Sequence, residues 1–144
     1  MLRSIISIVL GVVIGMASMM LMHYLSMLIY PLPEGVPFPP KREHEIKLFH
    51  EYIKVAPIVV LWLAILAHAT GSFIASIVST WISQCNKWET PFVPKYQFLI
   101  IGLLFTVLGY MNINSMPHPS WFWVDLLFYI PAAYIGYKLI AKKN

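Results

Sequence analysis

Residues 112–125 read NINSMPHPSWFWVD and lie between two long apolar runs. The prolines at positions 117 and 119 disfavour helix here, because proline lacks an amide hydrogen and restricts the residue before it. The stretch therefore predicts a turn between two helices. It also carries two asparagines, a histidine and a carboxylate. Most of the remaining chain is apolar and would hold this turn at one side of a membrane.

The composition sets the class of protein. Of 144 residues, 59% are hydrophobic and 11% are charged, whereas about 25% charged is usual in soluble domains. A soluble fold of this length could not bury so much apolar surface. A lipid bilayer instead requires helices of about 20 apolar residues that satisfy their own backbone groups. The sequence predicts one all-α integral membrane domain over residues 1–144, with the bilayer as its main partner.

The apolar stretches predict four membrane spans packed as a four-helix bundle. They cover about residues 4–30, 55–83, 96–112 and 119–140. After the first span, Tyr30–Pro40 reads YPLPEGVPFPP, which predicts an extended outer loop because proline fixes the backbone φ angle. Lys41–Lys54 then alternates charged and apolar residues at helical spacing, which predicts a short amphipathic helix at the membrane surface.

The basic residues indicate topology. They lie near the ends of apolar segments, so the net charge of +4 does not point to nucleic acid. With both termini inside, the inner basic residues are Arg3, Lys87, Lys95, Lys138, Lys142 and Lys143. The positive-inside preference then predicts cytoplasmic termini. The proline-rich loop and the turn at 112–125 would both face outward.

Small residues mark two predicted packing faces. Gly11 and Gly15 form GxxxG in the first span, and the second span repeats small residues every fourth position at Ala67, Gly71, Ala75 and Ser79. Small residues allow helix backbones to approach closely inside a membrane. These faces are expected to pack within the chain, against a membrane-protein partner or against a second copy.

A cluster of polar residues is predicted near the outer side of the bundle. Its candidate members are His23, Asn112, Asn114, His118 and Asp125. A carboxylate in hydrocarbon is costly unless it is paired, so Asp125 is expected to meet His23 or an asparagine amide. Two interpretations follow. The cluster either fixes the helix register or forms an outward-facing site that handles a small solute, protons or lipid.

Metal and cofactor sites are weakly indicated. A face of the first span carries thioethers and one imidazole, at Met16, Met19, Met20, His23 and Met27. Such ligands suit Cu(I), but methionine also fills irregular apolar gaps, and we expect packing, with no metal and no cofactor. His68 has no charged residue in its own span and is expected to make a structural helix contact. The single cysteine, Cys85, excludes an internal disulfide.

The common catalytic signatures are absent from the sequence. It contains no GxGxxG, P-loop, nucleophile elbow or HExxH motif. This favours a non-enzymatic structural, accessory or partner-binding protein, although scattered polar residues can serve a membrane enzyme. The aromatic residues of the last span, Tyr129 among them, are predicted to belong to an interfacial belt.

Three places in the chain resemble a family of small four-span bacterial membrane proteins. They are a YPxP loop at Tyr30, Pro31 and Pro33; the small-residue second span, 67–79; and a PHPxWF turn at Pro117, His118, Pro119, Trp121 and Phe122. The resemblance covers most of the chain and implies the fold and an inner-membrane location, not a particular activity. This chain departs from the family in its more charged segment at 41–54.

Overall fold

The computed structural model describes residues 2–36, 38–85 and 92–141, and these residues contain helices but no strand. The elements are α1 (Leu2–Ile29), α2 (Glu43–Val55), α3 (Ile58–Cys85), α4 (Phe92–Ser115), the 3-10 helix η1 (Ser120–Asp125) and α5 (Leu126–Ile140). The prediction of an all-α protein is confirmed.

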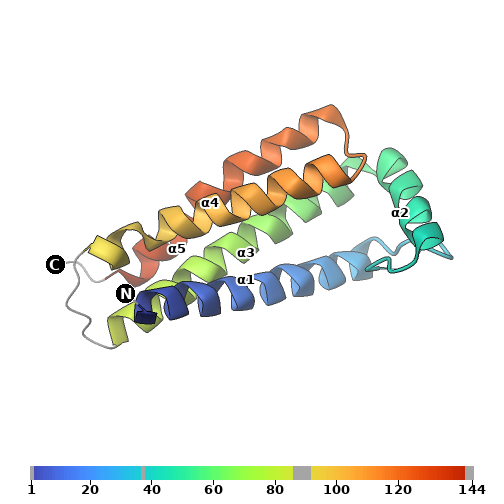
Figure 1. Cartoon of the computed structure of the whole chain (residues 1–144). Coiled ribbons are helices and arrows are strands. Elements are labelled where there is room, and N and C mark those ends of the chain that lie inside the picture. The colour runs from blue at the N-terminus through green and yellow to red at the C-terminus, as the bar shows by residue number, and fades with distance from the viewer. Residues whose placement is uncertain (1, 37, 86–91, 142–144) are drawn as a thin grey trace.

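The helices α1, α3, α4 and α5 run alongside one another, and α2 lies at one end of them (Figure 1). The central helix is α3, which contacts α1, α4 and α5, and α4 also packs against α5. The start of α1 and the end of α5 lie at the end opposite α2. The loop that precedes α2 and the turn between α4 and η1 therefore lie at the same end of the molecule.

Within the described residues, three helices are long and apolar enough to cross a membrane. They contain the stretches Ser4–Ile29, Ile58–Gln84 and Tyr96–Ser115. Large apolar side chains on their outer surfaces, such as Val13 and Leu21, are more than half exposed, as expected where lipid replaces water. The predicted fourth span differs in form, because the chain makes the 3-10 helix η1 before α5 begins.

Glycines allow α1 and α3 to lie very close together. A Cβ atom built on Gly15 would lie 2.5 Å from the Gly71 carbonyl oxygen and 2.7 Å from the Ala75 Cβ. One built on Gly11 would lie 2.5 Å from the Ala75 carbonyl oxygen. These contacts involve backbone, which cannot rotate away as a side chain can. Ala67 and Ser79 are also fully buried, so all six small residues singled out in the sequence lie inside this molecule.

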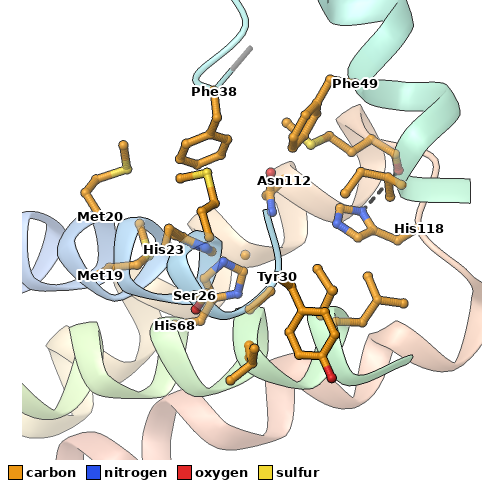
Figure 2. Close-up of a pocket in the computed structure, with 18 of the residues that line it drawn as sticks. Met19, Met20, His23, Ser26, Tyr30, Phe38, Phe49, His68, Asn112 and His118 are labelled. Atoms are coloured by element: carbon orange, nitrogen blue, oxygen red, sulfur yellow. Dashed lines mark hydrogen bonds between the residues drawn. The ribbon is translucent and has the colours of Figure 1, made fainter. Parts of the chain in front are cut away.

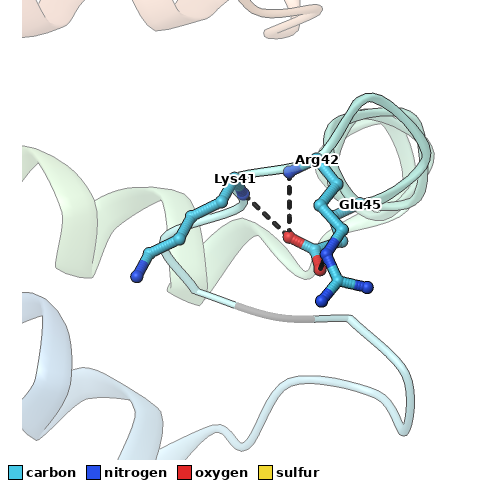
Figure 3. A network of polar contacts seen from close by, with 3 residues as sticks. All are labelled: Lys41, Arg42 and Glu45. Carbon is cyan, nitrogen blue, oxygen red and sulfur yellow. Dashed lines mark hydrogen bonds and ion pairs between the residues drawn. The ribbon is translucent and has the colours of Figure 1, made fainter.

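The first turn of α2 is held by one carboxylate. The backbone amides of Lys41 and Arg42 donate hydrogen bonds to Glu45 Oε2 at 2.8 and 3.0 Å (Figure 3). These backbone hydrogen bonds favour the ionised form and hold the pKa of Glu45 below its ordinary value. On its other face α2 buries Phe49 and Ile53, and the ring of Phe49 contacts that of Phe38 in the loop before α2.

We predict that acid weakens the hydrogen bonds that hold the first turn of α2. Because the pKa of Glu45 is lowered by folding, its contribution to stability is complete above the ordinary value of 4.5 and is lost as pH falls through the lowered value. Glu45→Ala should reproduce this loss at neutral pH. Hydrogen-exchange protection factors of the Lys41 and Arg42 amides, corrected for intrinsic rates, provide the measurement. Glu43→Ala is the control, because Glu43 pairs only with exposed Lys47 in this helix. Equal protection in the two variants would contradict the prediction.

Candidate functional site: a cavity beside α2

A cavity of about 350 Å³ lies at the α2 end of the bundle, within the size range of small-molecule sites. Its lining is mostly apolar and comes from α1, α2, α3, α4, α5, the loop before α2 and the turn after α4. Figure 2 shows Phe38 and Phe49 on one side of the space and His23 and His68 on the other. Phe38 belongs to the proline-rich loop, and its ring also contacts that of Tyr24 in α1.

Methionine is concentrated in the lining. Of the eight methionines in the chain, five line the cavity: Met16, Met19, Met20, Met27 and Met116. Their unbranched thioether chains adapt to apolar ligands of varied shape. Within the described residues, no three His, Cys, Asp or Glu side chains form a group that could hold a metal ion.

Next to the cavity lies a buried carboxylate, Asp125, whose side chain has no exposed surface. His68 Nδ1 lies 2.9 Å from Asp125 Oδ2, and the Tyr129 hydroxyl donates to the same oxygen at 2.7 Å. Tyr129 follows Asp125 by one helical turn, so the two side chains share a face. Asp125 Oδ1 has no hydrogen-bond partner among the described residues. The carboxylate is thus paired inside the bundle, as an ionisable group in a membrane must be.

The contacts of Asp125 determine which nitrogen of His68 carries hydrogen. Oδ2 accepts the Tyr129 hydrogen, so it acts as an acceptor for His68 as well, and Nδ1 carries the proton. Nε2 of the neutral ring is then an acceptor. It has no hydrogen-bond partner among the described residues, and His68 lines the cavity. The cavity therefore contains one hydrogen-bond acceptor supported by a buried carboxylate.

His23 and the aromatic residues complete this side of the site. The ring centroid of His23 lies 5.3 Å from that of His68 in an edge-to-face arrangement, and 5.8 Å from that of Phe38. Phe38 is in turn 5.8 Å from Phe49 of α2. These contacts join α1, α2 and α3 through aromatic rings around the cavity.

His118 lies in the turn after α4 and closes another part of the lining. Its ring stacks on Phe122 with centroids 4.3 Å apart, and its Nδ1 donates to the Met116 carbonyl oxygen at 3.3 Å. Burial lowers the pKa of His118 from its usual value, while the bond to Met116 acts in the opposite direction. Burial is the larger cause, so His118 is neutral near pH 7 and adds no charge to the cavity.

The structure brings together part of the predicted polar cluster. His23, Asn112 and His118 line the cavity. Asn114 does not, because it is exposed and donates to the Tyr110 carbonyl oxygen of its own helix. Asp125 lies behind His68 and has no exposed surface.

The expected partners of Asp125 were wrong. They are His68 and Tyr129, not His23 or an asparagine amide. The span of His68 holds no charged residue, and its partner Asp125 lies 57 residues away, on an element whose rotation the sequence does not show. The four-residue spacing of Asp125 and Tyr129 was the feature of the sequence that could have indicated their contact.

Buried polar contacts at the far end of the bundle fix the helices that carry the site. Ser83 Oγ of α3 lies 2.7 Å from Gln97 Oε1 of α4, and Gln97 Nε2 donates to Ser7 Oγ of α1 at 3.1 Å. Closer to the cavity, Ser72 donates to the Tyr129 carbonyl oxygen at 2.8 Å. Each bond joins α3 or α4 to a different helix, so the rotation of each helix about its axis is constrained.

Comparisons of the chain with known protein families, curated proteins and solved structures give no match. The cavity and the His68–Asp125 pair are therefore the features of the molecule that bear on its function.

Proposed function

We propose that this is a four-span inner-membrane protein that binds an apolar small molecule with a polar end in the cavity beside α2. The observation that carries the proposal is an apolar space of about 350 Å³ that contains an acceptor paired to a buried carboxylate. Protein interiors are normally packed without voids of this size. A purely structural bundle would have no need of the space, which favours the lipid-handling interpretation over a structural or accessory role.

The lengths of η1 and α5 support the fourth span. The 15 residues of α5 rise about 22 Å. The six residues of η1 add about 12 Å, because 3-10 helix rises about 2 Å per residue. Both elements together match the hydrocarbon core of about 30 Å. Membership of the four-span family with the YPxP loop and the PHPxWF turn is part of this proposal.

The proposed orientation places the cavity toward the outer leaflet and both termini in the cytoplasm. The supporting residues within the described helices are Arg3 near the start of α1, Lys95 near the start of α4 and Lys138 in the last turn of α5, all toward the terminal end of the bundle. Lys87, Lys142 and Lys143, which the same prediction uses, lie outside the described residues. The four basic residues at 41–54 lie among three glutamates at the cavity end, and Lys47 and Lys54 are paired with Glu43 and Glu51.

A photoactivatable probe tests the proposed function. The protein in lipid nanodiscs is irradiated with a dodecanol analogue that carries a diazirine in its chain, and the labelled residues are mapped by mass spectrometry. We expect labels on Met19, Met27, Phe38 and Phe49, which line the cavity. Labels confined to residues on the outer surface, such as Val13 and Leu21, would overturn the proposal.

A matched pair of tryptophan variants locates the binding space. Ser26 lines the cavity, so Ser26→Trp should fill it and reduce labelling about tenfold, equivalent to about 1.4 kcal/mol. Ala17 lies on the same helix with an exposed side chain outside the lining. Ala17→Trp should leave cavity labelling unchanged. Equal labelling of the two variants would show that the probe binds elsewhere.

A further inference from the structure

Of the polar side chains that line the cavity, His68 is the one held by a buried carboxylate. His68 Nδ1 is held 2.9 Å from Asp125 Oδ2, which leaves Nε2 with its lone pair and without a partner among the described residues. A ligand that only accepts hydrogen bonds, such as an ether, ester or ketone, would leave this nitrogen unpaired in an apolar space. An unpaired buried polar atom is costly. The site therefore favours a ligand that donates a hydrogen bond.

Charge limits the choice of donor. The buried carboxyl group of Asp125 lies directly behind His68, and in its ionised form it would repel an anionic head group such as a carboxylate. A cationic head group would have to lose its hydration in an apolar cavity, and the fully buried carboxylate offers it no surface to contact. His118 in the same lining is neutral and supplies no compensating charge.

We infer that the ligand is an amphiphile with a neutral hydroxyl group, alcoholic or phenolic, that donates its hydrogen to His68 Nε2 while its apolar part lies among the methionines. This inference rests on the proposed function, because it names the chemical class of molecule that occupies the same cavity. Asp125 and Tyr129 act as positioning residues, since they hold the ring of His68 in the tautomer that accepts.

Three competitors of equal chain length test the inference. Dodecanol, dodecyl methyl ether and dodecanoate are titrated against the photoactivatable dodecanol analogue, and labelling of Met19 and Phe38 is measured. Dodecanol should compete about tenfold better than its methyl ether, equivalent to about 1.4 kcal/mol, and dodecanoate should compete least. If the alcohol and the ether compete equally, the inference fails while the proposed function stands. If the probe labels no cavity residue, the proposed function itself fails.

Variants of two histidines show which group makes the contact. His68→Leu should remove the preference for the alcohol, so that the alcohol and the ether compete equally. His68→Gln should retain part of the preference, because its amide can donate to Asp125 and offer its oxygen to the ligand. His44→Leu is the control, since His44 is exposed on α2 and does not line this cavity. Preference that is kept in His68→Leu, or lost to the same extent in His44→Leu, would overturn the assignment. If His68→Leu does not fold, the difference between dodecanol and its methyl ether in competition for the unmodified protein decides the outcome.

Discussion

Gly15→Leu is expected to separate α1 from α3 and to lower the free energy of unfolding by about 3 kcal/mol, at the upper end of the usual cost of overpacking. The Gly15 Cβ position lies 2.5 Å from the carbonyl oxygen of Gly71, and that oxygen belongs to a helix backbone. The side chain can be accommodated only if the two helices move apart. The methionines of α1 would move with it, so ligand labelling in the cavity should fall as well.

Val13→Leu provides the control for this variant. Val13 is close to Gly15 in the same helix, but its side chain is 58% exposed and faces away from α3. Its replacement should leave the unfolding midpoint in detergent unchanged. The measurement is thermal unfolding followed by intrinsic fluorescence. If Gly15→Leu unfolds at the same temperature as Val13→Leu, the close contact of α1 and α3 contributes no stability.

Asp125→Leu is expected to destabilise the protein by about 3 kcal/mol, because it leaves two buried donors without an acceptor at about 1–3 kcal/mol each. These donors are the Tyr129 hydroxyl and His68 Nδ1–H, which both bond to Oδ2. Asp125→Asn keeps an acceptor oxygen of the same shape, so its loss should be about 1 kcal/mol, the usual net value of a hydrogen bond. Chemical unfolding in detergent measures both variants.

A double-mutant cycle with Tyr129→Phe separates the contact from general packing. If the Tyr129 hydroxyl bonds to Asp125, the effect of Asp125→Leu should be smaller in the Tyr129→Phe background, with a coupling energy of at least about 0.5 kcal/mol. Strictly additive effects would show that the two side chains act independently. A fully stable Asp125→Leu protein would show that the carboxylate is not needed for folding.

Much of the helical framework follows from the sequence, because hydrocarbon thickness sets the length of an apolar helix. The predicted second span, 55–83, differs from α3 by only a few residues, since Pro57 fixes where helix can begin. The small-residue face from Ala67 to Ser79 was visible because a spacing of four residues follows one face of a helix. In each case, residues that are close together in the sequence determine the structural feature.

The pairing of His68 with Asp125 was not predictable in the same way. It depends on how far η1 and α5 are rotated about their axes, and contacts between distant helices set that rotation. Gly102 of α4 packs closely against Ile130, where an added Cβ would lie 2.9 Å from the Ile130 Cα. Hydropathy also gave no sign that the chain would adopt 3-10 geometry before α5. Its tighter winding changes which face Asp125 occupies.

The start of α1 and the end of α5 lie together at the opposite end of the bundle from α2. An affinity tag, fluorescent protein or surface linker attached at either terminus would therefore be separated from the proposed ligand cavity by the full length of the helices. The attachment would leave the proposed cavity unobstructed, so binding of the probe could be tested on a sensor surface without removing it.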